Sequence, residues 1–331
     1  MKIGIFNEFM GNHKLLIKAC EDLGVEYKVI NIISADWIEN VLHSSCDYFL
    51  ASPSNLLSYW KTMFEEKIYY IENHLRKVVY PSFKELYFYE NKKNLAYWLG
   101  VENYPHPKTW VFYSKKEAIK FSISYKLPVV FKTNVGSAAM GVKIVKNRFY
   151  LKYLIFKAFP LLKIGFGGIL RWNTLKHKYN IPISVPILSD VQKGFIILQE
   201  FIQVRWEWRI IKIGESYFGH QKLQKGKFHS GSDLVGWVKP SFRLLDMIKS
   251  LTEKHGINCM AFDVFEDWNG KFYINEMQTS FLSRDPSQMY IDGIPGRFVF
   301  RDSKWKFEKG YFNKNGSNNL RILNLLQIAN Q

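Results

Sequence analysis

The segment 259–280 constrains the fold of this chain more than any other feature of its sequence. Its letters, CMAFDVFEDWNGKFYINEMQTS, form two strand-like runs around Asn269-Gly270, a dipeptide that favours the tight turn of a β-hairpin. A two-residue turn at this dipeptide places Asp263 directly opposite Glu276. The sequence therefore predicts a hairpin whose two strands bring two carboxylates face to face.

Opposed carboxylates repel each other unless a positive charge lies between them. The same register places Gln278 opposite Ala261, so a third oxygen-bearing side chain shares the face of Asp263 and Glu276. Mg²⁺ prefers carboxylates combined with phosphate oxygens. A magnesium site is the favoured interpretation of this face, and a proton-shared or solvated carboxylate pair is the alternative.

A second hairpin is predicted in segment 201–223, FIQVRWEWRIIKIGESYFGHQKL, with a Gly-Glu turn near its centre. This register places Arg209 opposite His220, and Glu207 opposite Lys222. An acid, a guanidinium, an imidazole and an ammonium would then share one sheet face. Such a cluster could hold a triphosphate or an acyl phosphate, and a surface ladder of charge pairs is the alternative.

Segment 129–145, VVFKTNVGSAAMGVKIV, has a strand that carries Lys132, a loop of small residues at 136–141, and a second strand. Small residues allow backbone N–H groups to approach phosphate oxygens, and Lys132 adds charge. The loop does not match a Walker loop, because no Gly-Lys-Ser/Thr leads into a helix. An ordinary β-turn is the alternative to a phosphate site.

The N-terminal part of the chain alternates between strand and helix patterns. Strands are predicted at 2–6, at 26–32 and within 44–52, and a helix over 14–24. This alternation predicts parallel, Rossmann-like pairing. The first turn lacks G-x-G-x-x-G, so dinucleotide binding is not supported there. One helix is predicted over 83–100, after Tyr80-Pro81.

Ligands of open α/β sheets bind at the carboxyl ends of the strands. Asn12 and His13 follow the first strand, so they are candidate substrate contacts. Arg284, in the loop after the hairpin, is a candidate carboxylate clamp because its fork matches a carboxylate. The alternative for Arg284 is a pairing with Asp285 or with solvent.

The net charge of +17 is concentrated in one stretch, because no acidic residue occurs between Glu117 and Asp190. Twelve Lys or Arg residues fall in that interval. Segment 149–178 mixes these cations with bulky apolar residues, which suits an anionic membrane surface. An internal helical insertion with solvated lysines is the alternative.

The order of these motifs along the chain resembles the ATP-grasp superfamily of ATP-dependent ligases. That order is a lysine-bearing strand with a small-residue loop, a strand ending in Gln199-Glu200, a Glu-x-Arg strand, and an Asp…Glu-x-Gln hairpin. The resemblance implies an α/β architecture with a Rossmann-like N-terminal domain over 1–82 and an ATP-grasp fold of two α+β subdomains. These subdomains would span 83–197, with a basic helical insertion near 149–187, and 198–331.

The resemblance also implies roles for individual residues. Arg209 and Lys222 would be catalytic and hold the transferred phosphate and the acyl phosphate. Asp263, Glu276 and Gln278 would bind Mg²⁺, or Mn²⁺ in its place, with Gln278 where the family usually has Asn. ATP would be bound by either Lys92 or Lys93 and by Lys132, Gly136, Ser137, Ala138, Gly141, Gln199, Glu200, Ile202 and Glu207.

The reaction that the resemblance implies is ATP-dependent joining of a carboxylate to an amine through an acyl phosphate, with release of ADP. The partners would be small-molecule or glycan-linked substrates in cell-surface polysaccharide biosynthesis. One alternative is an amino-acid or peptide ligase of the D-alanine–D-alanine or protein-glutamate type. The other is a non-catalytic ATP-binding or membrane-docking module.

Three exclusions complete the sequence analysis. The three cysteines are too scattered for a disulfide framework. The charge would allow nucleic-acid binding, but no recognised RNA- or DNA-binding motif is present. The absence of a signal peptide and of a long apolar run predicts a cytoplasmic protein, either free or peripheral at the inner face of the membrane.

Overall fold

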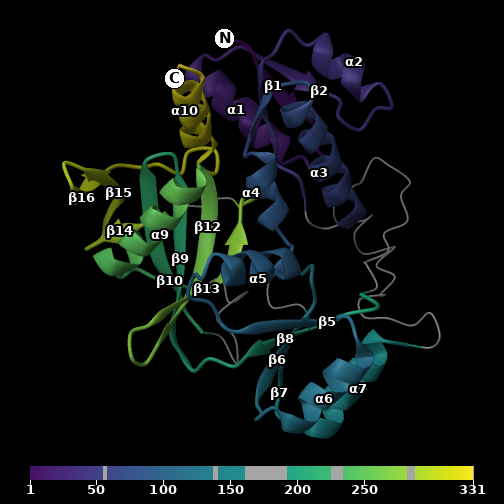
Figure 1. Cartoon of the computed structure of the whole chain (residues 1–331). Helices are drawn as coiled ribbons and strands as arrows, with labels where there is room; N and C mark the ends of the chain where they lie inside the picture. The colour runs from purple at the N-terminus through teal and green to yellow at the C-terminus, as the bar shows by residue number, and fades with distance from the viewer. Residues whose placement is uncertain (55–57, 137–140, 161–191, 225–233, 282–287, 331) are drawn as a thin grey trace.

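The computed structural model describes residues 1–331 except 55–57, 137–140, 161–191, 225–233, 282–287 and 331. In that part of the chain three β-sheets follow one another along the sequence (Figure 1). The first two have four strands each, and the third has eight.

The first sheet has the strand order β2-β1-β3-β4, and all its neighbouring strands are parallel. The parallel pairing predicted for the first strands is therefore confirmed. Helices cover both faces, because Ile3 and Ile5 pack with α1 while Phe49 packs with α3. The elements are β1 (Ile3–Phe6), α1 (His13–Leu23), β2 (Tyr27–Ile30), α2 (Trp37–Leu42), β3 (Tyr48–Leu50), α3 (Ser58–Asn73) and β4 (Val78–Tyr80).

Two short helices, α4 (Phe83–Phe88) and α5 (Lys92–Val101), follow where one continuous helix was predicted. The chain breaks because Glu90 adopts a left-handed φ of 49°, and Asn91 then caps α5 through the N–H of Asn94. The prediction of one helix over 83–100 is therefore wrong. The break matters because Lys92 then lines the cavity described below, while Glu90 contacts Lys92 and Gly136.

The second sheet is antiparallel, with the order β5-β8-β6-β7, and it lies beside α6 and α7 at the bottom of Figure 1. α6 begins where the Ser114 side chain accepts from the N–H of Glu117. Phe131 and Leu154 belong to the shared core of this lobe. Its elements are β5 (Thr109–Phe112), α6 (Lys115–Ser124), β6 (Val129–Lys132), β7 (Val142–Val145), α7 (Arg148–Ala158) and β8 (Ile196–Glu200).

The third sheet runs β13-β12-β9-β10-β15-β14, with β11 paired to β10 and β16 to β15. α9 packs on it, and α10 lies against α1 of the first sheet (Figure 1). The elements are β9 (Val204–Ile213), β10 (Ser216–Lys222), β11 (Val235–Gly236), α9 (Phe242–His255), β12 (Cys259–Asp267), β13 (Phe272–Gln278), β14 (Tyr290–Ile291), β15 (Ile294–Arg301), β16 (Lys304–Lys309) and α10 (Asn318–Ala329).

Candidate active site

The two predicted hairpins form with the predicted pairs, and they lie side by side in the third sheet. Arg209 faces His220 on one neighbouring strand and Asp263 on the other, and Glu207 faces Lys222. These side chains therefore lie on one face of the sheet. β9 is the strand that holds the set together, because it pairs with both β10 and β12.

Asp263 is the centre of a buried network of charges. Its two oxygens accept from Arg209, with Nε–Oδ1 at 2.8 Å and Nη2–Oδ2 at 2.9 Å. Lys222 donates to Asp263 Oδ2 at 2.9 Å and to Glu207. Asp263 is 2% exposed, so this network has little water around it. The structure brings together the two predicted catalytic residues and one predicted metal ligand.

The network shifts the pKa of Asp263 and Lys222 and of the neighbouring His220. Burial alone would raise the pKa of Asp263, but Arg209 and Lys222 lower it well below its usual range. Burial opposes the charge on Lys222, yet Asp263 and Glu207 raise its pKa. Burial and then the charge of Arg209 lower the pKa of His220 to about 3, so its imidazole is neutral. These groups keep fixed charges across the physiological pH range.

Asp263 and Glu276 face each other as predicted, but the turn between them is not the predicted one. The Asp267 N–H donates to the Lys271 carbonyl, which makes a three-residue loop with Gly270 at a φ of 72°. A bulge between Asp263 and Val264 then restores the predicted register. The prediction of a two-residue turn is therefore wrong, while the predicted carboxylate pair is confirmed.

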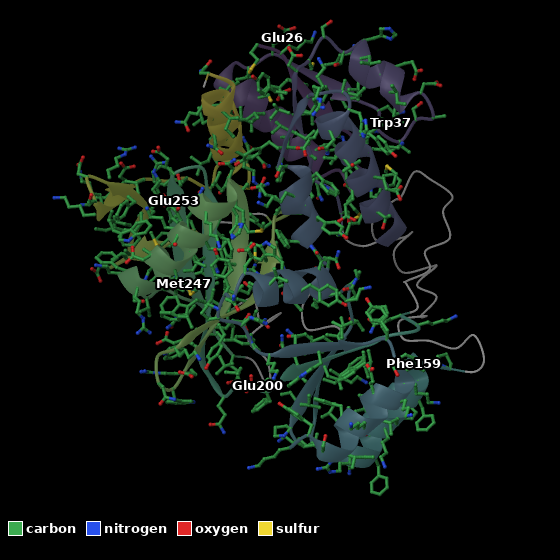
Figure 2. The ribbon with its side chains drawn as sticks, in the orientation of Figure 1. Glu26, Trp37, Phe159, Glu200, Met247 and Glu253 are labelled. Atoms are coloured by element: carbon green, nitrogen blue, oxygen red, sulfur yellow. The ribbon has the colours of Figure 1, made fainter. Side chains whose placement is uncertain are left out.

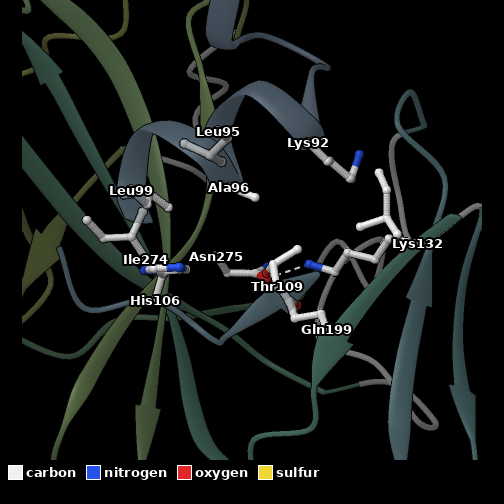
Figure 3. Close-up of a pocket in the computed structure, with 11 residues that line it drawn as sticks. Lys92, Leu95, Ala96, Leu99, His106, Thr109, Lys132, Gln199, Ile274 and Asn275 are labelled. Atoms are coloured by element: carbon white, nitrogen blue, oxygen red, sulfur yellow. Dashed lines mark hydrogen bonds between the residues drawn. The ribbon is translucent and has the colours of Figure 1, made fainter. Parts of the chain in front are cut away.

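The bulge has a functional consequence, because its extra residue is Asn275. Val264 pairs with Ile274 and Asp263 with Glu276, so Asn275 is left without a partner of its own on β12. Its Oδ1 accepts from Lys132 Nζ at 2.7 Å (Figure 3). Sequence reasoning missed Asn275, since no sequence motif predicts a β-bulge at this position.

Lys132 is a buried cation that donates a hydrogen bond to a neutral amide. It is 6% exposed, and in the described part of the chain no carboxylate lies within ion-pair distance of it. Burial lowers its pKa to about 8. Burying an ammonium without a counter-ion is costly, and a phosphate oxygen would supply the missing charge.

Lys92 joins the second carboxylate to the loop that begins at Gly136. Its Nζ lies 3.2 Å from Glu276 Oε1, 3.5 Å from Glu90 Oε2 and 2.8 Å from the Gly136 carbonyl oxygen. The Gly136 N–H donates to Glu90 Oε2 at 2.8 Å. Lys93 instead lies over the Phe195 ring at 4.1 Å. Lys92 therefore lies beside the predicted carboxylate pair, whereas Lys93 contacts an aromatic ring. Glu90, which sequence reasoning missed, belongs to the same group of contacts.

A cavity extends from Lys132 between the second and third sheets (Figure 3). Leu95, Leu99 and Ile274 form its apolar side. Gln199 lines it as well and donates from Nε2 to the Thr109 hydroxyl at 2.9 Å. Its volume is about 20 Å³, which is room for roughly one water molecule. A purine ring would enter only after the walls move apart.

The remaining predicted ATP contacts are less central. Glu200 ends β8 at the junction between the two lobes (Figure 2), where its exposed side chain accepts from the Lys108 N–H. Ile202 is half-buried in the connection to β9. Gly141 has a φ of 87°, and a Cβ there would come within 2.1 Å of the Thr133 hydroxyl, so this position requires glycine.

Several predicted residues lie outside the described part of the chain: Ser137, Ala138, Arg284 and the portion of the basic stretch from 161 onward. Asn12 and His13 are described, and both are half-buried behind β1. Asn12 Nδ2 lies 3.5 Å from the Ser52 carbonyl oxygen, and His13 Nδ1 accepts from the Glu8 N–H at 3.0 Å. Gln278 is half-buried at the end of β13, opposite Ala261 as predicted.

No protein-family model matches the chain, and no curated protein does. The chain is similar to a solved RimK-domain ATP-grasp protein from Sphaerobacter thermophilus, with a TM-score of 0.53 and 12% identity over 85% of this chain and 91% of that one. It is also similar to N5-carboxyaminoimidazole ribonucleotide synthetase from Thermotoga maritima, with a TM-score of 0.54 and 14% identity over 84% and 68%.

A third similar structure is a RiPP-associated ATP-grasp ligase from Chryseobacterium gregarium, solved with ADP and a leader and core peptide. Its TM-score is 0.54, with 12% identity over 85% of this chain and 90% of that one. The similarity covers most of the chain in each case, and the fold predicted from the sequence is confirmed. The chain has the fold of the ATP-grasp superfamily.

Proposed function

We propose that the protein is an ATP-dependent carboxylate–amine ligase that releases ADP. The observation that carries this proposal is the buried ammonium of Lys132. Among the described residues no carboxylate lies within ion-pair distance of it, although Asp263, Glu207 and Glu276 are within electrostatic range. A structural lysine in such a place would be paired. An anionic group of a substrate would supply the negative charge that Lys132 lacks. The ATP-grasp neighbours solved with ADP contain such an anion, a polyphosphate.

The reaction would take place in two steps. A substrate carboxylate oxygen attacks the γ-phosphorus of ATP, and the bond from that phosphorus to the β-bridging oxygen breaks to release ADP. An amine nitrogen then forms a bond to the acyl carbon while the carbon–oxygen bond to phosphate breaks, and the nitrogen loses its proton to the medium. Arg209 and Lys222 would stabilise charge on the transferred phosphoryl group, and Lys132 would hold the nucleotide phosphates.

The predicted metal ligands suit Mg²⁺ in their donor chemistry, since Asp263 and Glu276 supply opposed carboxylates and Gln278 an amide oxygen. In the described residues, no group of three or more His, Cys, Asp or Glu side chains could hold a metal alone. Mg²⁺, or Mn²⁺, would therefore need phosphate oxygens to complete its shell. Once bound it would neutralise phosphate charge, while Arg209 and Lys222 would exchange part of their contact with Asp263 for substrate.

The identity of the substrates is a finer proposal. A glycan-linked substrate is supported by the basic stretch alone. An amino-acid or peptide substrate is supported by the peptide in the Chryseobacterium structure, which is a property of that protein. A non-catalytic module would not require both the paired network at Asp263 and the poised cation at Lys132.

ADP release tests the proposal. Wild-type protein is supplied with Mg²⁺-ATP, hydroxylamine and a panel of amino acids, uronic acids and short peptides, because hydroxylamine intercepts an acyl phosphate as a hydroxamate. Hydroxamate that depends on ATP and on one carboxylate supports a ligase. ATP binding without hydroxamate formation across the panel would favour the non-catalytic module.

We also propose that α7 approaches an anionic lipid surface. Phe149, Tyr153 and Phe156 are exposed on it at 84%, 55% and 54%, and Lys152 and Lys157 are close to them along the helix. In the described residues no helix has the length and apolarity to cross a membrane. Co-sedimentation with phosphatidylglycerol vesicles at low salt, lost at high salt, is expected. Equal recovery with neutral vesicles would contradict this contact.

A further inference from the structure

Glu8, directly behind β1, is a buried charged group that the site described above does not use. Its side chain is 3% exposed. Its Oε2 accepts from the backbone N–H groups of Met10, at 2.7 Å, and Asn12, at 3.4 Å. Its Oε1 is buried and has no hydrogen-bond partner among the described residues. A buried acceptor without a donor costs free energy, so this oxygen marks the place of a missing donor.

The surroundings of Glu8 are formed by three segments that are far apart in the sequence. Asn12, in the same loop, contacts the Ser52 carbonyl oxygen, and Ser280 donates its hydroxyl to the Pro53 carbonyl at 3.2 Å. Ser280 follows β13, the strand that carries Glu276. The chain after β3 therefore meets both the loop after β1 and the chain after the β12–β13 hairpin.

Tyr89 connects Glu8 to the charged cluster. Its phenol forms a hydrogen bond with Ser280, and its pKa is raised first by burial and then by the charges of Glu90, Glu8 and Glu276. One buried side chain thus lies within electrostatic range of both Glu8 and the predicted metal ligand. Tyr89 therefore connects Glu8, on the side of the first sheet, to the cluster that contains Glu276.

No protein cation neutralises Glu8 in the described part of the chain. His13 contacts the backbone of Glu8: its Nδ1 accepts from the Glu8 N–H, so the ring proton of the neutral imidazole lies on Nε2. Burial lowers the pKa of His13, which keeps the imidazole neutral. Burial raises the pKa of Glu8 to about 7, because backbone hydrogen bonds alone do not compensate for lost water. A cationic group of a bound substrate would compensate for the lost hydration of the Glu8 carboxylate.

We propose that Glu8 binds the amino group of the amine substrate, which donates an N–H of its ammonium form to Oε1. The ammonium then loses one proton to the medium, and the neutral nitrogen that remains is the form that attacks the acyl carbon. The inference rests on the proposed ligase function and adds the position of one substrate to it. A carboxylate offers acceptors only, so it complements an ammonium and repels the carboxylate substrate, which belongs beside Arg209 and Lys222. Residues 10–13 are each half-buried, and two of them donate backbone N–H groups to Glu8. Binding of the amine at Oε1 requires a movement of this loop.

A binding experiment tests the site without any turnover. Protein labelled with ¹³C at glutamate carboxyl carbons is titrated near neutral pH with methylammonium chloride, and separately with tetramethylammonium chloride at the same ionic strength. The Glu8 signal is assigned by its loss in Glu8→Gln or, if that variant does not fold, by its change in Glu8→Asp. We expect a saturable shift with methylammonium alone, since it brings N–H donors. A signal that ignores both ions, or follows both equally, overturns the proposal.

Turnover adds a second test with its own control. With the amine that supports wild-type ADP release, Glu8→Gln should raise KM for that amine about tenfold or more and leave the ATP affinity unchanged. Hydroxamate formation should stay at the wild-type level, because hydroxylamine attacks as a neutral molecule. Glu39→Gln, an exposed carboxylate on α2, should match wild type. An unchanged KM in Glu8→Gln overturns the subsite, whereas absent hydroxamate in wild type counts against the ligase reaction instead.

Discussion

The two sheets that enclose the cavity treat their buried cations in opposite ways. On the eight-stranded sheet, Arg209 and Lys222 share the carboxylates of Asp263 and Glu207, which raise the pKa of both cations against the effect of burial. On the small sheet, Lys132 contacts an amide, and burial lowers its pKa to about 8. The charges of Arg209 and Lys222 are neutralised by carboxylates of the protein itself. The charge of Lys132 would be neutralised by an anionic ligand.

Because of this difference, substitutions on the two sheets should affect the free energy of unfolding and ATP binding to different extents. A buried ion pair loses much more when one partner is removed than the pair itself contributes, because the other partner is left unpaired. A buried cation without a counter-ion is already a cost to the folded state. Substitutions on the large sheet should therefore damage both folding and turnover, whereas substitution of Lys132 should damage nucleotide binding alone.

The largest effect is expected from Asp263→Asn. This change leaves Arg209 and Lys222 short of a carboxylate in a buried site, so the free energy of unfolding should fall by about 3–5 kcal/mol. ADP release should be nearly abolished. Urea denaturation and ADP release measure the two quantities, and Glu215→Gln, at the exposed turn of the same sheet, is the control and should remain within about 0.5 kcal/mol of wild type. Wild-type stability and turnover in Asp263→Asn would contradict the proposed difference between the paired cations of the large sheet and Lys132 of the small sheet.

Glu276→Gln should separate the two properties more clearly. Lys92 keeps Glu90 as a partner, so the stability loss should be only about 1 kcal/mol. Turnover should still fall by about tenfold or more, because the second predicted metal carboxylate is gone. The Mg²⁺ concentration that supports half-maximal ADP release should rise. A variant with an unchanged Mg²⁺ requirement would show that Glu276 serves Lys92 and not the metal.

Lys132→Met is the direct test of the small sheet. Removal of a buried ammonium without a carboxylate partner should leave the unfolding free energy unchanged or raise it, while the Kd for ATP rises about tenfold or more. Calorimetric titration and thermal melting measure the two effects, and Lys146→Met, an exposed lysine just after β7, is the matched control. Loss of stability comparable to that of Asp263→Asn would mean that Lys132 is a structural cation after all.

The smallest effect is a pH dependence of ATP binding. The pKa of Lys132 is about 8 in the free protein, and bound phosphate would raise it. The ammonium form is therefore lost from the free protein first as the pH rises, so the Kd for ATP should rise above pH 8 by up to about tenfold per pH unit. Lys132→Arg should remove this slope, because a guanidinium stays charged. A slope of the same size in Lys132→Arg would assign the titration to another group.

The large sheet was more predictable from the sequence than the small one. The pairs Arg209–His220 and Glu207–Lys222 follow from strand alternation and one turn position. The pairing of β9 with β12, which brings Asp263 to Arg209, was not predicted. The register at Asp263 and Glu276 was also predicted correctly, but two differences cancelled. The turn is one residue longer than expected, and the bulge at Asn275 takes up the extra residue.

The groups that were missed are those that depend on contacts between distant segments. Glu90 needs the break between α4 and α5, and the letters around it read as one helix. Asn275 needs a bulge, and Glu8 needs the burial that three loops provide together. Secondary-structure propensity and residue spacing are properties of one segment. They therefore do not predict which backbone N–H groups or side chains of distant segments will contact that segment in the folded chain.

The contact of Lys92 with Gly136 has a consequence for how any affinity of this protein is read. Lys92 already holds a carbonyl oxygen at 2.8 Å and the carboxylate of Glu276 at 3.2 Å before a ligand arrives. A phosphate that takes this lysine displaces those partners, so binding is an exchange of bonds and not a net addition. A measured Kd for ATP therefore reports the difference between two sets of contacts. Weak affinity would be compatible with a well-built site, and variants that weaken the resting contacts at Glu90 should bind ATP more tightly than wild type.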